Sequence, residues 1–274
     1  MIQSINSHRF AMIAGNGRFP FLVLEGAREQ NVDLVVFAIR EEASPELSRK
    51  SSRVHWLSLG EAARLMELLR AERIDKVILA GQVKHAQLYS SIPADHVVSG
   101  ALSALDRKNT DALIGAFVQM LEGQGIEVTD STLFLKPMLA SSGLLSGREL
   151  DAGERADVEY GRQVAKALAG LDIGQTVVIA DRACIAVEAM EGTDAAIERA
   201  ADLSNGRRLV VVKVSKPGQD MRFDVPVVGP RTAEVMQRSN ARVLAVDAAK
   251  TLLFERDLLL RKAAEAGISI IGVE

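Results

Sequence analysis

The sequence is poor in cysteine and has no long hydrophobic run, and both absences limit where the protein works. Cys184 is the single cysteine, which excludes an internal disulfide framework and is typical of a reducing compartment. No segment approaches the roughly 20 apolar residues that a transmembrane helix needs. The first ten residues, MIQSINSHRF, lack the apolar core of a secretion signal. We therefore expect a cytoplasmic protein.

Several signatures of enzymes and nucleic-acid-binding proteins are also missing. The histidines, at positions 8, 55, 85 and 96, do not have the spacing of a zinc or binuclear metal site. Neither the G-x-x-x-x-G-K-[ST] loop of P-loop NTPases nor the G-x-S-x-G elbow of serine hydrolases occurs. Aromatic residues make up only 4% of the chain and the formal net charge is −3. We therefore expect no nucleic-acid partner.

The arrangement of apolar segments predicts an α/β fold. The length of 274 residues suits one large or two ordinary domains. In the first half, apolar runs at 10–14, 33–39 and 76–80 alternate with helical patterns, which indicates a parallel sheet covered on both faces. The pattern breaks repeatedly between 130 and 153, and we place a domain junction there. The predicted domains are 1–136 and 137–274.

The second half also alternates strands and helices, in a different order. Strands are predicted at 176–180, 185–189, 209–212, 242–246 and 268–273, the first two paired around 181–183. Helices are predicted at 157–168, 193–201, 232–237 and 252–266. The C-terminal domain is therefore expected to be α/β as well.

Two glycine-containing loops, AGNG at 14–17 and GQVKH at 81–85, follow predicted strands of the first domain. Backbone N–H groups before a helix can hold phosphate, but a plain tight turn explains the first loop equally well. Pro20 stands where a dinucleotide-binding fingerprint would have its third glycine, which speaks against a standard nicotinamide site. Because ligands bind at the carboxyl ends of strands in open α/β sheets, both loops are predicted to face one crevice. Lys84 either binds phosphate or is solvated, and His85 receives no catalytic role.

A third loop, EAMEGTD at 188–194, links a predicted strand to a helix. In a structural interpretation, Thr193 caps that helix and Asp194 interacts favourably with the helix dipole. Capping does not explain Glu188 and Glu191, which add acidic groups near the same turn. The structural and the functional interpretations of this loop are evenly supported.

The stretch 209–229, LVVVKVSKPGQDMRFDVPVVG, carries the strongest chemical signal. An apolar strand rises into a cluster of charged residues: Lys213, Lys216, Asp220, Arg222 and Asp224. Nearby prolines exclude a helix, so 220–224 is predicted to be extended. In an extended chain Asp220, Arg222 and Asp224 share one face.

Two carboxylates on one face suit Mg²⁺, which takes oxygen ligands, neutralises phosphate oxygens and helps to activate water. Lys213, Lys216 and Arg222 would hold phosphate charge as it builds up in a transition state. The alternative is a solvated network of surface ion pairs. The end of an apolar strand and the framing by proline and glycine favour the functional interpretation.

Several segments together resemble the LpxI family of UDP-2,3-diacylglucosamine pyrophosphatases of lipid A biosynthesis. They are AGNGRFP (14–20), GQVKH (81–85), LDIGQTVVIA (171–180), AVEAMEGTD (186–194) and VKVSKPGQDMRFDVPVVGP (212–230). The resemblance covers nearly the whole chain and is most specific in 213–230. It implies Mg²⁺-dependent hydrolysis of UDP-2,3-diacylglucosamine to UMP and 2,3-diacylglucosamine 1-phosphate (lipid X), with water attacking the lipid-side phosphorus. It also implies a Rossmann-like N-terminal domain, a C-terminal α/β domain with substrate between the two, and a homodimer.

By motif position the resemblance singles out Asp224 as the residue most important for activity. Asp224, with Asp220, is expected to bind Mg²⁺ or to orient water, and Lys213 and Arg222 to stabilise the pyrophosphate. The residues expected to bind substrate are Gly15, Asn16, Gly81, Gln82, Thr193, Asp194 and Lys216. Candidates for contact with the acyl chains are Phe19, Phe21, Leu139 and Leu144. No basic amphipathic helix stands out, so we expect only transient contact with the inner membrane surface.

Two other classes of protein use the same features. A non-catalytic nucleotide-sugar or lipid-phosphate binding protein would use the same loops and keep the carboxylates as structural ion pairs. A nucleotide-sugar oxidoreductase would need a dinucleotide site, which the incomplete glycine fingerprint disfavours.

Overall fold

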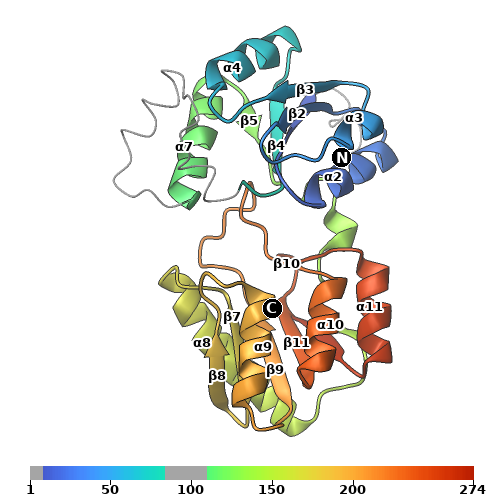
Figure 1. Ribbon diagram of the computed structural model, residues 1–274, viewed down its shortest axis with the longest axis vertical. Helices are drawn as coiled ribbons and strands as arrows, with labels where there is room; N and C mark the ends of the chain where they lie inside the picture. The colour runs from blue at the N-terminus through green and yellow to red at the C-terminus, as the bar shows by residue number, and fades with distance from the viewer. Residues whose placement is uncertain (1–8, 84–109) are drawn as a thin grey trace. The chain divides into compact units, whose positions relative to one another are not determined.

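The computed structural model describes residues 9–83 and 110–274, and the chain divides into two compact units (Figure 1). Unit 1 contains the residues up to Leu135 together with Met221–Asp224. Unit 2 contains Lys136–Asp220 and Val225–Glu274. The short segment Met221–Asp224 therefore comes from the second half of the sequence but packs with the first unit.

Unit 1 is built on a five-stranded sheet in which all neighbouring strands are parallel. In spatial order the strands are β3 (Val54–Leu57), β2 (Val35–Ile39), β1 (Phe10–Ala14), β4 (Lys76–Ala80) and β5 (Glu127–Val128). The three strands predicted from apolar runs are present as β1, β2 and β4. The sequence pattern missed β3 and β5, which are short strands at the two edges of the sheet.

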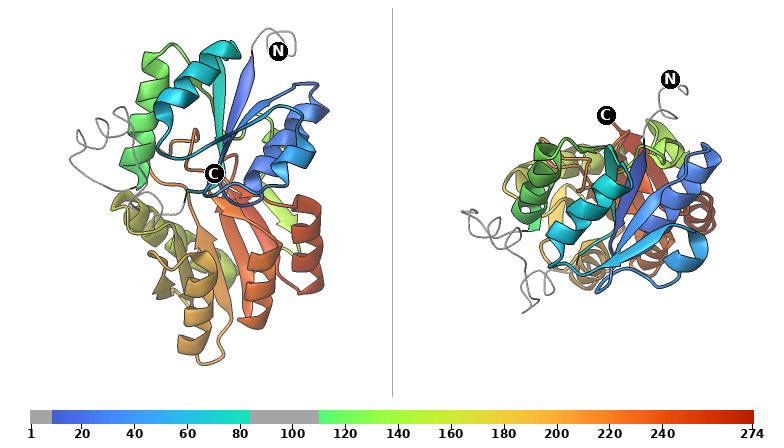
Figure 2. Two further views of the ribbon diagram at one scale, coloured as in Figure 1. Left: turned by 45° about the horizontal axis from the view of Figure 1, so that its top comes forward. Right: turned by 90° about the horizontal axis from the view of Figure 1, so that it is seen from above.

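Helices cover both faces of the unit 1 sheet, α2 (Phe19–Glu29) and α3 (Leu47–Lys50) on one side and α4 (Ala62–Ala71) and α7 (Thr110–Gly123) on the other (Figures 1 and 2). The strand order reverses between β1 and β4, because β2 and β3 lie on one side of β1 while β4 and β5 lie on the other. In open α/β sheets the carboxyl ends of strands at such a reversal form the ligand crevice. The loops after β1 and β4 occupy that position.

Unit 2 has a six-stranded mixed sheet. In spatial order its strands are β6 (Gly143–Ser146), β13 (Ser269–Val273), β11 (Ala241–Asp247), β9 (Leu209–Lys213), β7 (Thr176–Ala180) and β8 (Ala183–Val187). The three central strands β13, β11 and β9 are parallel, whereas β6 and β7 run antiparallel to their central neighbours. β8 is antiparallel to β7 and so runs in the direction of β9. The ends of β8, β9 and β11 therefore lie at the same edge of the sheet.

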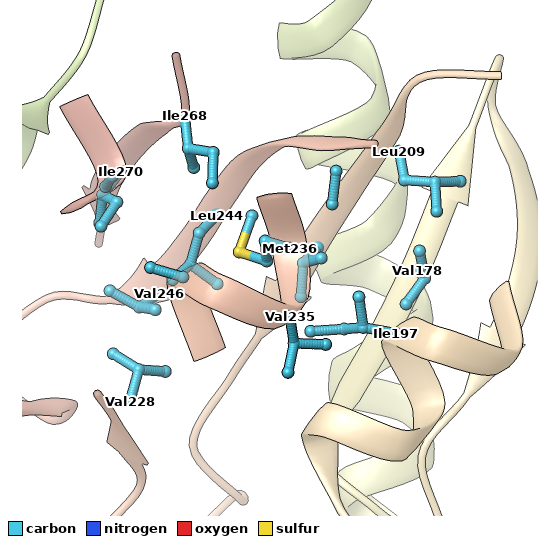
Figure 3. Close-up of a cluster of buried hydrophobic side chains, with 14 of the residues drawn as sticks. Val178, Ile197, Leu209, Val228, Val235, Met236, Leu244, Val246, Ile268 and Ile270 are labelled. Atoms are coloured by element: carbon cyan, nitrogen blue, oxygen red, sulfur yellow. The ribbon is translucent and has the colours of Figure 1, made fainter. Parts of the chain in front are cut away.

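Both faces of this sheet are buried, which explains the continuous apolar run of β9. On one face, Val211 belongs to a core that also contains residues of α9 (Thr193–Leu203), α10 (Pro230–Arg238) and α11 (Arg256–Glu265). Figure 3 shows Leu209 of β9 in this core together with Ile197 of α9 and Met236 of α10. On the other face, Val210 and Val212 pack with α8 (Ala152–Gly170). Gly161 allows α8 to approach closely, because a Cβ atom there would lie 2.7 Å from the Val212 side chain. None of the described helices is both long and apolar enough to cross a membrane.

Most predicted elements of unit 2 are present, with shifted boundaries. The predicted strand pair is the β7–β8 hairpin, whose second strand begins two residues earlier than expected. Its turn places Asp181 and Arg182 at positive φ, 52° and 57°, as a tight two-residue hairpin turn requires. Buried Asp157 accepts hydrogen bonds from both backbone N–H groups of this turn.

The predicted helix at 252–266 is partly wrong. Leu252–Leu253 forms β12, which pairs with β10 (Val227–Val228) in a small parallel sheet. Helix α11 begins only at Arg256 because Glu255 adopts a left-handed conformation, with φ 46°. The apolar residues Leu252 and Leu253 belong to a strand, and periodicity alone does not distinguish a short strand from the start of a helix.

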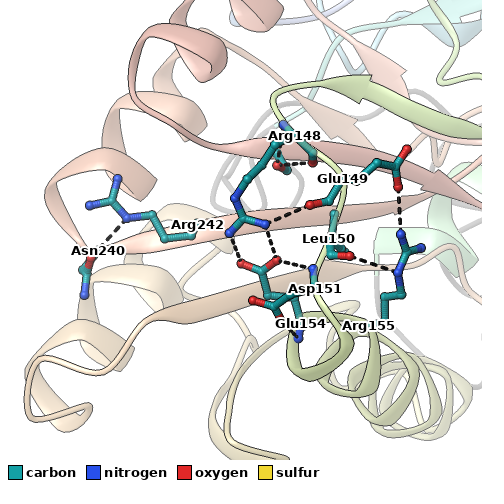
Figure 4. Close-up of polar contacts among 9 residues, drawn as sticks. Arg148, Glu149, Leu150, Asp151, Glu154, Arg155, Asn240 and Arg242 are labelled. Carbon is teal, nitrogen blue, oxygen red and sulfur yellow. Dashed lines mark hydrogen bonds and ion pairs between the residues drawn. The ribbon is translucent and has the colours of Figure 1, made fainter.

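The start of α8 is fixed by a capping box and an ion pair (Figure 4). Asp151 accepts a hydrogen bond from the Glu154 backbone, and the Glu154 carboxylate accepts one from the Asp151 backbone. Arg148 donates two hydrogen bonds to the same carboxylate, at 2.8 and 2.6 Å. These hydrogen bonds from Arg148 lower the pKa of Glu154 below its ordinary value, against the opposing effect of burial.

We expect Glu154→Ala to lower the free energy of unfolding at pH 7 by about 1–2 kcal/mol, because it removes the ion pair with Arg148 and the hydrogen bond from the Asp151 backbone to the Glu154 carboxylate. A lowered folded-state pKa stabilises the protein above the unfolded-state pKa and loses that effect as pH falls through the folded-state pKa. The difference between variant and wild type in urea unfolding should therefore shrink below about pH 4. Glu159→Ala, an exposed change on the same helix, should change stability by less than about 0.5 kcal/mol. If Glu154→Ala lowered the free energy of unfolding equally at pH 7 and below about pH 4, that result would contradict a role that depends on the charge of Glu154.

Candidate active site

The loops after β1 and β4 in unit 1 are bound to each other. The backbone N–H of Asn16 donates to the Gln82 carbonyl at 2.7 Å, and the N–H of Gln82 donates back to the Asn16 carbonyl at 3.1 Å. The N–H of Gly15 donates to the carbonyl of Ala80, at the end of β4. The four residues predicted to bind substrate in this unit, Gly15, Asn16, Gly81 and Gln82, are therefore brought together at the reversal of strand order.

Both glycines are required by the contact between these loops. A Cβ atom at Gly15 would lie 2.5 Å from the Gln82 carbonyl oxygen, and one at Gly81 would lie 2.5 Å from the Asn16 carbonyl oxygen. Gly81 also has φ +93°, a conformation that side chains other than glycine rarely adopt. Because the N–H groups of Gly15, Asn16 and Gln82 already donate to carbonyls, they do not form a phosphate-binding loop. Lys84 and His85, from the same predicted loop, lie outside the described residues.

The Asn16 side chain is oriented by an acidic residue that the sequence did not single out. Its Nδ2 donates to Glu42 Oε2 at 3.3 Å, and Glu42, which follows β2, is buried. This bond uses one of the two N–H groups of the Asn16 amide and identifies the nitrogen as the end of the amide that faces Glu42.

The segment Met221–Asp224 is a turn attached to unit 1, and the predicted extended conformation of 220–224 is wrong. Residues 221–223 form the turn. The Ser131 backbone donates to the Met221 carbonyl, and Ser131 Oγ lies 2.6 Å from the Arg222 carbonyl oxygen. Phe223 packs against the unit 1 core. Prolines exclude a helix, but they do not distinguish a strand from a turn held by a distant serine.

This turn changes the expected relation among Asp220, Arg222 and Asp224. Strand alternation no longer places their side chains on one face, and Asp220 belongs to unit 2 while Asp224 belongs to unit 1. Arg222 Nη1 forms an ion pair with Glu122 Oε1 of α7 at 2.7 Å. Any role of Arg222 in binding phosphate would compete with this partner.

In unit 2, Lys213 is the centre of a buried polar cluster at the end of β9. Its Nζ donates to Thr193 Oγ1 at 2.7 Å, and Thr193 Oγ1 donates to Glu188 Oε1 at 2.9 Å. Thr176 Oγ1 lies 3.2 Å from the same Thr193 oxygen. Lys213 is 5% exposed and Glu188 7%. A buried ammonium and a buried carboxylate are thus connected through one hydroxyl group.

The predicted capping role of Thr193 is wrong. Gly192 occupies the cap position of α9, with φ 87°, and Thr193 is the first helical residue. Its hydroxyl is therefore available to the cluster around Lys213. Asp194 accepts a hydrogen bond from Thr232 and pairs with Arg231 at 3.1 Å, which ties the start of α9 to the start of α10.

Glu191, the second acidic residue in this loop, has a structural role. Its carboxylate pairs with Arg199 at 2.6 Å and accepts a hydrogen bond from the Ala189 backbone. The hydrogen bond from Arg199 holds the pKa of Glu191 below its ordinary value. Glu191, which capping did not explain, therefore has structural partners of its own in Arg199 and the Ala189 backbone.

A second buried charged group, around Asp247, fixes the chain that follows Lys213. Asp247 Oδ2 accepts hydrogen bonds from the Ser215 backbone at 2.8 Å and from Ser215 Oγ at 2.7 Å, and it pairs with Lys166 of α8. Burial acts to raise the pKa of Asp247, but the hydrogen bonds from Lys166 and Ser215 outweigh it and lower that pKa. Lys216, which follows Ser215 in the sequence, forms an ion pair with Asp172 at 2.9 Å. Asp247 was missed from sequence.

The described residues contain no group of three or more histidine, cysteine, aspartate or glutamate side chains arranged to hold a metal ion. The candidate carboxylates predicted from the sequence, Asp220 and Asp224, belong to different units. Each offers oxygen atoms, the ligand type that Mg²⁺ takes, whereas zinc sites typically contain cysteine or histidine.

The four residues suggested for contact with acyl chains are spread over both units. Phe19 and Phe21 lie in the first turn of α2 in unit 1. In unit 2, Leu139 forms an isolated bridge with Leu252, and Leu144 of β6 is 40% exposed. Leu144 lines a groove of about 710 Å³ between α8, β6 and β13. Phe19 and Phe21 therefore belong to a different unit from this groove.

Known proteins match nearly the whole of this sequence. The model of the LpxI N-terminal domain matches residues 9–138, and the model of the LpxI C-terminal domain matches residues 141–271. The UDP-2,3-diacylglucosamine pyrophosphatase LpxI of Caulobacter vibrioides is 30% identical over 276 residues, which cover 97% of this chain and 98% of that protein.

Two solved structures show a weak likeness to this chain. The biotin carboxylase domain of a thermophilic 2-oxoglutarate carboxylase bound to ADP is 11% identical, covering 63% of this chain and 35% of that chain with a TM-score of 0.27. The corresponding Hydrogenobacter thermophilus domain in complex with MgADP, ADP and bicarbonate is 12% identical, covering 76% and 44% with a TM-score of 0.28. Neither likeness supports a conclusion about the fold or the function of this chain. On the two domain models and the Caulobacter relative, the chain belongs to the LpxI family.

Proposed function

We propose that the chain hydrolyses the pyrophosphate bond of UDP-2,3-diacylglucosamine to UMP and 2,3-diacylglucosamine 1-phosphate (lipid X). Water attacks the lipid-side phosphorus, the bond from that phosphorus to the bridging oxygen breaks, and UMP leaves with the bridging oxygen. The observation that carries the proposal is the match, over 97% of the chain, to a relative named for this activity.

Among the lysine and arginine residues proposed to stabilise the pyrophosphate, Lys213 has the surroundings that best suit this role. Its burial and its hydrogen bond to Thr193 hold the ammonium in one place, so it would meet developing charge on a phosphate oxygen without first reorganising. Arg222 is proposed for the same task, although it would exchange its ion pair with Glu122 for phosphate. Lys216, already engaged with Asp172, is proposed to bind substrate.

Asp224, with Asp220, is proposed to hold Mg²⁺ or to orient the attacking water. When bound, Mg²⁺ neutralises phosphate oxygens and lowers the pKa of coordinated water. Asp224 follows the turn fixed by Ser131, so unit 1 determines its backbone position.

The remaining substrate-binding residues are proposed in two groups. In unit 1, Gly15 and Gly81 let the two loops meet, and Asn16 and Gln82 would contact substrate through their side chains because their N–H groups are occupied. In unit 2, Thr193 and Asp194 lie at the N-terminus of α9, where the helix dipole favours a phosphate. A homodimer, a cytoplasmic location and transient contact with the inner membrane remain predictions.

The test is to incubate the protein with UDP-2,3-diacylglucosamine and Mg²⁺ in H₂¹⁸O and to analyse both products by mass spectrometry. Attack on the lipid-side phosphorus places the label in lipid X, whereas attack on the uridine side places it in UMP. Omitting Mg²⁺ in the presence of a chelator should abolish product formation if the metal is required.

The same experiment separates the alternatives. Tight substrate binding without UMP release would favour a non-catalytic nucleotide-sugar or lipid-phosphate binding protein. A nicotinamide cofactor that co-purifies with the protein would favour an oxidoreductase. Label in UMP would retain the enzyme class but refute the proposed point of attack.

A further inference from the structure

Glu188 is a buried acidic residue that the proposed reaction does not use. It follows β8 directly, and its backbone is fixed on both sides. Its N–H donates to the Thr176 carbonyl at 2.8 Å, and Gly174 packs so closely that a Cβ there would lie 2.0 Å from the Glu188 carbonyl oxygen. The position of the Glu188 Cα atom is therefore fixed, and the side chain reaches Thr193 through Oε1.

The chemistry of the three groups dictates the direction of their hydrogen bonds. An ammonium group only donates, a carboxylate only accepts, and a hydroxyl has one proton to give. With Lys213 at 2.7 Å and Glu188 at 2.9 Å, the Thr193 hydroxyl must give its proton to Glu188 and accept from Lys213. Thr176, at 3.2 Å, then has to donate to the other lone pair of Thr193. Glu188 thus determines how the hydroxyl is presented to Lys213.

Glu188 also supplies charge where burial makes charge costly. Lys213 is 5% exposed, and an ammonium removed from water needs a compensating negative group. Only one oxygen of Glu188 is satisfied: Oε2 is buried without a hydrogen-bond partner among the described residues. An unsatisfied buried oxygen destabilises a fold, and such groups call for an explanation beyond folding.

We propose that Glu188 is a positioning residue for Lys213, acting through the Thr193 hydroxyl. This inference rests on the proposed function, in which Lys213 stabilises the pyrophosphate in the transition state. Glu188 does not touch substrate. It keeps the hydroxyl turned so that Lys213 Nζ stays in the place where phosphate charge develops.

The test compares Glu188→Gln, Thr193→Val and the double variant in the full-length protein, with UDP-2,3-diacylglucosamine and Mg²⁺. Glutamine keeps the size of Glu188 but removes its charge and offers either a donor or an acceptor to Thr193, so the fixed hydrogen-bond direction is lost. For Glu188→Gln we expect kcat to fall about 10- to 100-fold, the loss expected when a catalytic group is slightly misplaced, and KM to change less than about threefold. Because both residues act through one hydroxyl, the double variant should be no slower than Thr193→Val alone. Thr193→Ser should retain most of the wild-type kcat.

Glu191→Gln is the matched control, the same change three residues along in the same loop, and it should leave kcat unchanged. Losses that multiply in the double variant, or a Glu188→Gln protein that loses stability but not kcat, would overturn the inference while leaving the proposed function intact. A Lys213→Met protein with full kcat would refute the role of Lys213 and this inference together. Failure of the wild type to release UMP would refute the proposed function itself.

Discussion

Replacing Asp224 with alanine is expected to lower kcat by about 10³-fold or more, the size of effect seen when a group needed in the transition state is removed. The carboxylate is the residue of the 213–230 segment proposed to bind Mg²⁺ or to orient water, and alanine can do neither. UMP release under saturating substrate and Mg²⁺ measures the loss. The thermal unfolding midpoint should stay close to that of the wild type, because Asp224 lies at the end of a loop turn and outside the hydrophobic clusters.

A titration with Mg²⁺ distinguishes the two roles proposed for Asp224. If it is a metal ligand, Asp224→Asn should need much more Mg²⁺ for half-maximal activity, because a neutral amide is a weaker ligand for a hard cation. If it orients water, the Mg²⁺ requirement should stay near the wild-type value while kcat remains low. Asp220→Ala tests the second carboxylate in the same way.

The control for Asp224 is Asp202→Ala, which removes an exposed carboxylate from α9 and should leave kcat unchanged. Full activity in Asp224→Ala would refute its assignment as the most important residue. Loss of activity together with loss of the folded state would also refute it, because the effect would then arise from stability.

The parts of this molecule that follow from local sequence are the buried strands and the loops at their ends. FAMIA and the residues LVVV of β9 are continuously apolar, which is typical of strands buried on both faces. Because ends of parallel strands meet at one edge, the loops at 15–16 and 81–82 could be predicted to lie together. The structure confirms this and adds that they bind each other by backbone hydrogen bonds.

The parts that could not be predicted depend on contacts between distant residues. The turn at 221–223 is held by Ser131, separated from Arg222 by 91 positions, and no local pattern reveals that attachment. Asp247 was missed because its partner Lys166 lies 81 positions away on another element. The sequence marks Glu188 as an acid that capping does not explain, but its proposed role depends on Thr193 and Lys213, which meet only in the folded chain.

Replacing Lys213 with methionine is expected to lower kcat by about 10²- to 10³-fold, because it removes a preorganised positive charge from the proposed site of pyrophosphate cleavage. Methionine fills similar space, so the packing at the end of β9 should persist. The same change leaves the Glu188 carboxylate buried without a compensating cation, and breaking such pairs costs about 3 kcal/mol. Activity and the free energy of unfolding should therefore both fall.

A double variant separates these two effects of Lys213. In Lys213→Met/Glu188→Gln the buried negative charge is also removed, so the free energy of unfolding should recover by more than half while kcat stays at the level of Lys213→Met. Urea unfolding and UMP release measure the two quantities on the same samples. Lys262→Met breaks a lysine–glutamate pair on the surface and should change neither quantity appreciably, because exposed pairs contribute about 0–1 kcal/mol. Recovery of kcat along with stability would mean that Lys213 serves folding alone, and the charge that stabilises the pyrophosphate would have to come from another residue.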